Sequence, residues 1–518
     1  MLTSGNENFK VKPDPRRLTD IYITIMLLVF PLFTGFSGYS KITESKYVFF
    51  LAVTGLWLIA AVAPAAVHAI RTHARFRPTA AQTAVLLYFA LCVVSSVLSP
   101  YGSAVLLGAG RYDGLLTIFA YVCIFLGVSS LGELKDHHIF AFAVSVSVCC
   151  AVAFVQLFAK NALQLFPNDL LYYDADVYYS GEFLGTIGNT DLLSGFLCLA
   201  IPLFAALFIT DAVRFAWVML IPACLGCLIL AVSHVSGGAV ALICCALVAA
   251  PFTVRSANRL RRAAIFAFFA VICVSAALCF EPDFTDRVFT CTFGLRLFLI
   301  SCVVAAAVCS AVYAVSYLPF FAKSRCVTAA IIVAEAAVCI ACLIVVYNWP
   351  GSSGTIYELC CVLHGKISDE FGSHRIQIWR RMLELFRERP LFGGGPDTIS
   401  LRSDITFSRY VRELGKTRYT YVDNAHNEYL GHLVNTGMLS LAAYLGAIIS
   451  SLLRWIRGDG RKCLLPALGC SLFAYWVQSF FGLGLCIAAP LMWVLWGLFE
   501  AREKNDKKTD KDICTAGV

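Results

Sequence analysis

Residues 328–347 read TAAIIVAEAAVCIACLIVVY, an apolar run with one charged side chain, Glu335. A helix of about 20 residues rises about 30 Å, which is the thickness of the hydrocarbon core of a bilayer. Similar runs recur from Ile21 to Phe499. They leave 59% of the chain hydrophobic and only 14% charged, where soluble proteins carry about 25% charged residues. The sequence therefore predicts an all-α polytopic integral membrane protein.

About fourteen transmembrane helices are expected. The first apolar run has no small-residue cleavage site after it, so we expect a retained span rather than a signal peptide. The predicted centres lie near Leu28, Leu56, Leu87, Tyr121, Val148, Leu199, Leu220, Ile243, Val271, Val304, Val338, Ala443, Phe473 and Val494.

The distribution of Lys and Arg predicts the orientation. Alternate connections are basic, and the basic side is the cytoplasmic side. The basic connections include residues 71–77, 255–262, 323–325 and 454–462. Both termini fall on the same side and are predicted to be cytoplasmic. The net charge of +8 thus follows from topology and gives no reason to expect a nucleic-acid partner.

One long polar stretch interrupts the apolar pattern, and it divides the chain. It is expected to be an extracytoplasmic loop with short amphipathic helices, because long loops translocate largely regardless of charge. The predicted divisions are 1–210 and 211–347 for two sets of transmembrane helices, 348–427 for the loop, 428–500 for the last transmembrane helices and 501–518 for a charged tail.

Inside this loop, residues 373–389 are predicted to form an amphipathic helix. Its apolar side would consist of Ile376, Trp379, Leu383 and Phe386 at helical spacing. Ser373 is expected to cap the start and Pro390 to end the helix. Such a basic helix would lie in the outer headgroup region.

The rest of the loop gives two weaker expectations. The glycines and proline at 393–396 predict a tight turn, not a phosphate-binding loop, since no Lys-Ser/Thr follows. Residues 404–421 are either an ordered cap over a cavity or a solvated charged surface.

His426 is the sharpest candidate for catalysis. It stands where the loop enters a predicted span, and a histidine can take a proton from an attacking hydroxyl near neutral pH. Asp423, Asn424 or Glu428 could orient its second ring nitrogen; alternatively, His426 is a structural residue at a span boundary.

Arginines supply the complementary chemistry. The guanidinium of Arg375 matches a phosphate bidentately and is always charged. Arg111 is either a second phosphate contact or a residue that snorkels at a helix end. Cysteines lie mainly in apolar spans, and no Cys/His spacing indicates a metal site.

Several motifs resemble the O-antigen ligase and polymerase-related family. They are Arg375-x3-Trp379, Pro390-x2-Gly393-x-Gly395, and His426-Asn427 followed by Gly437. Residues 111–114 and 188–189 resemble further segments of its members, and the similarity extends over about residues 220–446.

The resemblance implies a GT-C-like, inverting, metal-independent glycosyltransferase without a cofactor. It would move a glycan from an undecaprenyl-pyrophosphate carrier to an acceptor hydroxyl at the outer face of the bacterial cytoplasmic membrane. By the same resemblance His426 would be the base and Arg375 a pyrophosphate contact. The predicted substrate-binding set is Arg111, Asn427, Asn189 and Arg380.

The chain also departs from the family pattern. Gly237 stands where an arginine is usual, with His234 nearby, and Ser440 replaces a second glycine after Gly437. We expect a water-filled cavity at Gly237 that tolerates His or Arg. Fourteen spans exceed the twelve or so usual for ligases.

Other readings of the whole chain remain open. One is a flippase for the lipid-linked glycan, although charges inside the apolar runs are few. Another is a relative that has lost catalysis. The sequence does not separate ligase from polymerase, and the acceptor is a glycan, a lipid or a protein.

Overall fold

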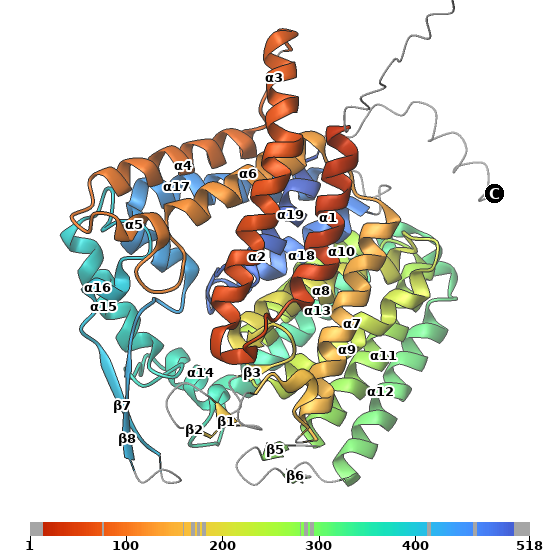
Figure 1. Cartoon of the computed structure of the whole chain (residues 1–518). Coiled ribbons are helices and arrows are strands. Elements are labelled where there is room, and N and C mark those ends of the chain that lie inside the picture. Colours follow the sequence, from red (N-terminus) through yellow and green to blue (C-terminus); the bar gives the residue numbers. More distant parts are fainter. Residues whose placement is uncertain are drawn as a thin grey trace, which may run out of the picture.

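The computed structural model is a bundle of helices with a smaller layer of loop structure along one side (Figure 1). The description covers eleven segments of the chain. They are residues 14–74, 77–158, 160–166, 171–172, 177–178, 183–279, 281–283, 288–290, 295–411, 416–458 and 464–501. Residues 1–13 and 502–518, which include both predicted cytoplasmic termini, lie outside it.

The first half of the chain contains one helix after another. In order these are α1 (Pro15–Leu32), η1 (Gly38–Lys41), α2 (Ile42–Trp57), η2 (Leu58–Val62), α3 (Ala63–Arg71), α4 (Ala80–Val97), α5 (Ala104–Leu107), α6 (Leu115–Leu131), α7 (Asp136–Gln156), η3 (Ala162–Gln164), α8 (Thr190–Thr210), η4 (Ala216–Met219), α9 (Leu220–Val232), α10 (Ser236–Thr253) and α11 (Ala257–Cys279). Three short hairpins pair β1 (Leu171–Tyr172) with β2 (Val177–Tyr178), β3 (Phe183–Leu184) with β4 (Gly188–Asn189) and β5 (Glu281–Asp283) with β6 (Val288–Thr290).

The second half continues the bundle and adds the loop structure. Its elements are α12 (Leu295–Val315), η5 (Pro319–Ala322), α13 (Ser324–Tyr347), α14 (Thr355–Leu363), α15 (Arg375–Glu388), α16 (Ile399–Arg402), the hairpin of β7 (Thr406–Val411) and β8 (Lys416–Tyr421), α17 (Glu428–Arg457), α18 (Leu464–Gln478) and α19 (Ala489–Glu500).

Each of the fourteen predicted span centres lies in a helix. Within the described residues, nine helices are long and apolar enough to cross a membrane, and four more apolar helices are shorter. The polytopic helical class is therefore confirmed, while the count of fourteen spans stays a prediction.

α8 is the centre of the bundle. Every residue of its most apolar window is buried, whereas none is buried in that of α13 and few are in that of α12. Away from their first residues, the exposed side chains of α12 and α13 are mostly apolar, as in a helix that faces lipid. α8 packs against α18 and α9, and α17 packs against α4. The packing of α8 against α18 and α9 thus fixes the position of its first residues within the bundle.

The long loop has a small core of its own. Ile378, Met382 and Leu385 of α15 are buried and pack with four buried residues of neighbouring segments. Those four are Ile399, Val422, Ala425 and Val434. The predicted helix is confirmed within two residues at each end, but its expected apolar face is only partly right. Leu383 is 43% exposed, because the neighbours of α15 are protein segments on another face.

Ser373 does not cap α15. The residue before the helix is His374, which has φ +66° and makes no capping hydrogen bond with its side chain. Ser373 itself has φ +58°, whereas a capping serine has extended backbone. The expected cap is therefore wrong.

The glycine turn joins the loop to the bundle. Gly393 and Gly395 have φ of +67° and +113°, which glycine adopts at little cost. The backbone N–H of Gly395 donates to the carbonyl of Asn435 at 2.7 Å, and that of Gly394 to Val434 at 3.1 Å. The predicted tight turn is confirmed, and it lies against α17.

The stretch after α16 is a hairpin, β7–β8, which extends away from the helices at the side of the molecule (Figure 1). Tyr419 and Tyr421 are strongly exposed. The hairpin therefore fits the expected solvated surface better than the expected cap over a cavity.

Candidate functional site

His426 lies in a turn just before α17, partly buried, and its backbone is strained. Its φ is +45°, a region that residues other than glycine seldom adopt. Two hydrogen bonds hold this turn. The backbone N–H of His426 donates to Oδ1 of Asn424 at 3.0 Å, and the indole of Trp379 donates to the carbonyl of Ala425 at 3.1 Å. Residues with strained backbone conformations are found most often at functional sites, where the surrounding structure stabilises the conformation.

The hydrogen-bonding partners of the neighbouring residues differ from those expected. Asn424 binds the backbone of His426, Asp423 binds Arg111, and Glu428 accepts from the hydroxyl of Tyr444 at 2.8 Å. None of these described contacts reaches the imidazole. The turn itself therefore positions His426.

Arg375 begins α15 and faces the start of α8. Its Nη2 lies 3.8 Å from Oδ1 of Asp191, and its Nη1 donates to the carbonyl of Gly372 at 3.3 Å. Its Nε is buried without a hydrogen-bond partner among the described residues. A buried unpaired donor is costly, so this guanidinium is suited to an additional acceptor group.

Arg111 is already paired within the protein. Its Nε and Nη2 donate to the two carboxylate oxygens of Asp423 at 2.7 and 3.1 Å. Asp397 fixes the backbone of the same turn by accepting from the N–H groups of Gly110 and Arg111 at 3.1 and 2.8 Å. The two interactions hold the turn between α5 and α6 against the long loop.

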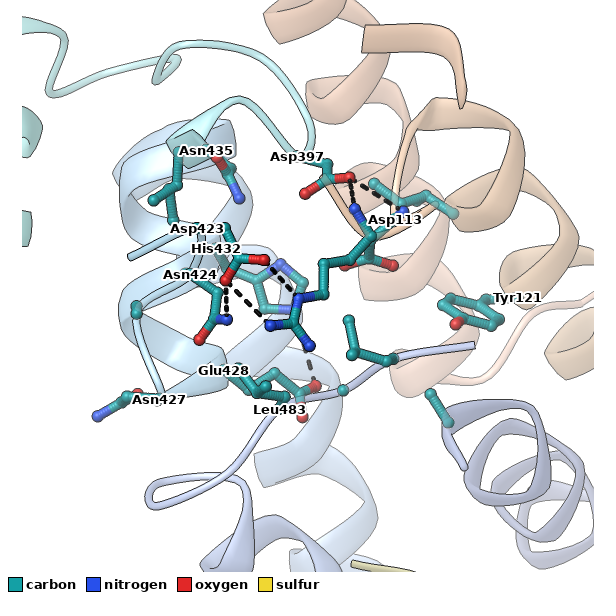
Figure 2. Close-up of a pocket in the computed structure, with 18 of the residues that line it drawn as sticks. Asp113, Tyr121, Asp397, Asp423, Asn424, Asn427, Glu428, His432, Asn435 and Leu483 are labelled. Carbon is teal, nitrogen blue, oxygen red and sulfur yellow. Dashed lines mark hydrogen bonds and ion pairs between the residues drawn. The ribbon is translucent and has the colours of Figure 1, made fainter. Parts of the chain in front are cut away.

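A cavity of about 70 Å³ lies among the long loop, α6 and α17 (Figure 2), and His426 itself is not part of its lining. Four carboxylates line it, together with amides and aromatic rings from α4, α6, α17 and α19. The lining includes Tyr88, Arg111, Asp113, Tyr121, Asp397, Asp423, Asn424, Asn427, Glu428, His432, Asn435 and Trp493. Ala425 and Asn427, which flank His426 in sequence, both belong to this lining.

Burial and four charged residues change the pKa of His426. Burial lowers its pKa from 6.5; Arg375 and Arg111 lower the pKa further, and Asp191 and Asp423 oppose them. The lowered pKa favours the neutral imidazole, which is the form that can accept a proton. Burial, followed by the charges of Asp397 and Glu428, raises the pKa of Asp113 well above its usual value.

The structure places the other predicted substrate residues in different surroundings. Asn189 caps α8 by accepting from the backbone N–H of Asp191 at 3.0 Å, and Asn427 caps α17 by accepting from Leu430 at 3.0 Å. Arg380 forms an exposed ion pair with Asp369 at 2.9 Å. Asn427 lies at the cavity and Asn189 lies two residues before Asp191, but no described contact brings Arg380 to His426. Their binding roles stay predictions.

The expectation for Gly237 is wrong. The residue is buried in α10, and a Cβ built on it would lie 2.6 Å from Cβ of Phe481. There is no room for His or Arg at this position. His234 is exposed in the turn before α10, and no described contact joins it to the site. The usual family arginine thus has no counterpart at this position.

Sequence reasoning missed the carboxylates that organise the site. Asp113 stands inside the recognised segment 111–114 and Asp397 directly follows the turn at 393–396, but their roles depend on contacts across more than 280 residues of sequence. Asp191 follows Asn189 and was not singled out. The only available signal was that acidic residues accompany the predicted arginines.

One cluster of described residues has the spacing of a metal site, and it lies elsewhere. Asp20, His137 and His138 bring ligand atoms within 4.8 Å of one another. However, Nδ1 of His138 accepts from the backbone N–H of Lys135, so its proton is on Nε2, which faces Asp20. Lys135 also pairs with Asp20 at 2.8 Å. These groups form an ion-pair network between α1 and α7.

Residues 293–445 match a protein-family model described as O-antigen ligase. The match runs from the start of α12 into α17, so it includes Arg375, the glycine turn and His426, and begins later than the expected residue 220. A search of curated proteins found no match.

Proposed function

We propose that this protein transfers a glycan from an undecaprenyl-pyrophosphate carrier to an acceptor hydroxyl. The match of residues 293–445 to a family model described as O-antigen ligase supports glycan transfer in general. The reaction takes place at the outer face of the bacterial cytoplasmic membrane. The observation that carries the proposal is that Arg375 is near enough to the strained His426 to lower the pKa of its imidazole, while the buried Nε of Arg375 has no hydrogen-bond partner among the described residues.

The proposed reaction is a single displacement. Neutral His426 takes the proton of the acceptor hydroxyl, whose oxygen attacks the anomeric carbon of the donor sugar. The bond from that carbon to the pyrophosphate oxygen breaks, and undecaprenyl pyrophosphate leaves with the electron pair. The configuration of the anomeric carbon is inverted.

Arg375 acts on the leaving group. Its guanidinium binds the pyrophosphate, and the negative charge that develops there strengthens the contact in the transition state. Asp191 holds the guanidinium loosely at 3.8 Å, so a phosphate can take its place beside the arginine. The reaction so described needs no metal ion.

The test uses the purified full chain with a synthetic undecaprenyl-pyrophosphate oligosaccharide in excess EDTA. We expect release of undecaprenyl pyrophosphate and a product with inverted anomeric configuration, read by NMR. Release that requires a divalent metal would contradict the metal-independent step. Movement of the lipid across vesicles without release would identify a flippase instead.

A further inference from the structure

We propose that the cavity lined by Asp113, Tyr121 and Glu428 is the acceptor site, and that it takes the hydroxyl-bearing edge of a neutral sugar (Figure 2). This inference rests on the proposed function and adds to it the class of acceptor. It commits the acceptor to a sugar without phosphate groups.

Two polar atoms of the cavity wall are buried without a hydrogen-bond partner among the described residues. The hydroxyl of Tyr121 is buried without a hydrogen-bond partner, and the whole residue is only 5% exposed. Oε2 of Glu428 is likewise buried and unpaired, on a side chain 9% exposed. Buried groups of this kind normally have partners. Both line the same cavity, which therefore suits a ligand with several hydroxyl groups.

The lining also contains a pair of stacked aromatic rings. Trp493 and Tyr121 stack with their ring centres 5.7 Å apart and an angle of 14° between their planes. Binding sites for small molecules combine such aromatic surface with a few placed polar groups. A cavity of about 70 Å³ has room for about five water-sized groups, which corresponds to one edge of a sugar ring.

Charge excludes phosphorylated ligands from this cavity. Four carboxyl groups line it. Asp423 is paired with Arg111, and burial raises the pKa of Asp113 well above its usual value, so Asp397 and Glu428 are the remaining anionic groups. The one arginine of the lining, Arg111, is already paired bidentately with Asp423. A phosphate placed here would meet like charges without a free cation. The pyrophosphate of the donor therefore belongs beside Arg375, outside the cavity.

A cation is a poor alternative occupant. Within the described part of the chain, three or more ligand atoms of the metal-binding type converge at Asp20, His137 and His138, and the cavity carboxylates do not form such a group. Asp397 and Asp423 already bind backbone N–H groups and Arg111. A neutral ligand with several hydroxyl groups can form hydrogen bonds with the unpaired polar atoms of Tyr121 and Glu428.

The position of the cavity suits an acceptor. Ala425 and Asn427 line it on either side of His426 in sequence, and Arg111 and Asp423 of its wall act electrostatically on that imidazole. Arg375 and Asp191 act on the imidazole as well but do not line the cavity. His426 is thus influenced both by the Arg111–Asp423 pair of the cavity wall and by the Arg375–Asp191 pair outside the cavity.

Binding by the full chain in nanodiscs tests the inference without requiring catalysis. Saturation-transfer NMR would compare methyl glycosides of glucose, galactose, mannose and N-acetylglucosamine with glucose 6-phosphate. At least one neutral glycoside should bind, and glucose 6-phosphate at least ten-fold more weakly. Tyr121→Phe should weaken neutral binding about ten-fold. The matched control Tyr313→Phe, which removes a hydroxyl from α12 outside the cavity, should not.

Three results would overturn the inference. They are binding of none of the neutral glycosides, tighter binding of glucose 6-phosphate, or neutral binding unchanged in both Tyr121→Phe and Asp113→Asn. Binding of Ca²⁺ that is lost in Asp113→Asn would show that the cavity binds a cation and not a sugar. Since none of these measurements requires transfer, a chain that binds sugars but releases no carrier would refute the proposed reaction and leave the cavity assignment intact.

Discussion

The chemistry of this protein depends on a few side chains whose partners are distant in sequence. Trp379 illustrates how a motif residue works. It was expected on the apolar side of an interfacial helix, yet its indole donates to the carbonyl of Ala425, next to His426. The Arg-x3-Trp spacing therefore places the proposed phosphate-binding group and a support for the proposed base on one helix. Trp379 is a positioning residue.

The pH dependence of transfer tests the state of His426. The neutral imidazole is the active form of a base, and the folded pKa lies below 6.5 because of burial and the two arginines. At pH 6.5 more than half of the protein is then active. We predict that kcat/KM at pH 6.5 exceeds half of its plateau value, and that the acid limb lies lower. An acid limb centred above pH 6.5 would contradict this assignment.

The sequence identifies candidate site residues better than it identifies the side chains with which they interact. His426 and Arg375 stand out because of their positions at the ends of polar and apolar stretches. The ion pair of Arg111 with Asp423 spans 312 residues, and no local pattern connects them. Which residue orients the imidazole stays a prediction, because Asp423, Asn424 and Glu428 all have other hydrogen-bond partners in the described residues.

Among the elements, α17 does the most to join the loop to the bundle. Gly437 has φ +85° and ψ 173° inside this helix, a conformation that is essentially confined to glycine. The break lets the backbone of Leu391 and Phe392 contact the helix, and the N–H of Met438 donates to the carbonyl of Pro390 at 2.9 Å. Gly437 thus sets the place of the glycine turn.

Gly437→Ala should destabilise the protein. The backbone conformation alone costs alanine about 1–3 kcal/mol, and the added Cβ would meet the carbonyl oxygen of Leu391. We predict a clear loss of thermal stability and of transfer. Gly446→Ala is the matched control in the same helix, since nothing lies within 4 Å of its Cβ. Equal stability of the two variants would show that the close contact with the loop does not matter.

The loop also shows where element prediction fails. Helical periodicity predicted α15 to within two residues at each end, because Pro390 and the spacing of apolar residues are local signals. The buried face was shifted toward Ile378, Met382 and Leu385. Periodicity alone does not say that a loop has its own core instead of a membrane surface to pack against.

For the whole molecule, hydropathy predicted the architecture well. All fourteen expected centres lie in helices, since apolar runs of about 20 residues have few alternatives to membrane-spanning helices. The sequence does not predict which helices lie at the centre of the bundle. The apolar windows of α8 and α13 have similar composition, yet that of α8 is fully buried and that of α13 is not buried at all. Which of them lies at the centre depends on contacts with all the others.

Gly237 tests this packing. Any side chain there would press on Phe481, and overpacking a close contact costs about 1–3 kcal/mol even for small additions. We predict that Gly237→Arg lowers the yield of folded protein in detergent. Gly55→Ala, in open surroundings within α2, should leave the yield unchanged. Full recovery of monodisperse Gly237→Arg protein would reveal space that the structure does not contain.

The most direct test of the central claim is a single-turnover measurement of undecaprenyl pyrophosphate release by three purified proteins in EDTA. They are the wild type, His426→Ala, and His364→Ala, in which an exposed histidine of the same loop is removed. We predict that release falls at least a hundred-fold in His426→Ala and stays within two-fold of wild type in His364→Ala. Equal release by all three proteins would contradict His426 as the base.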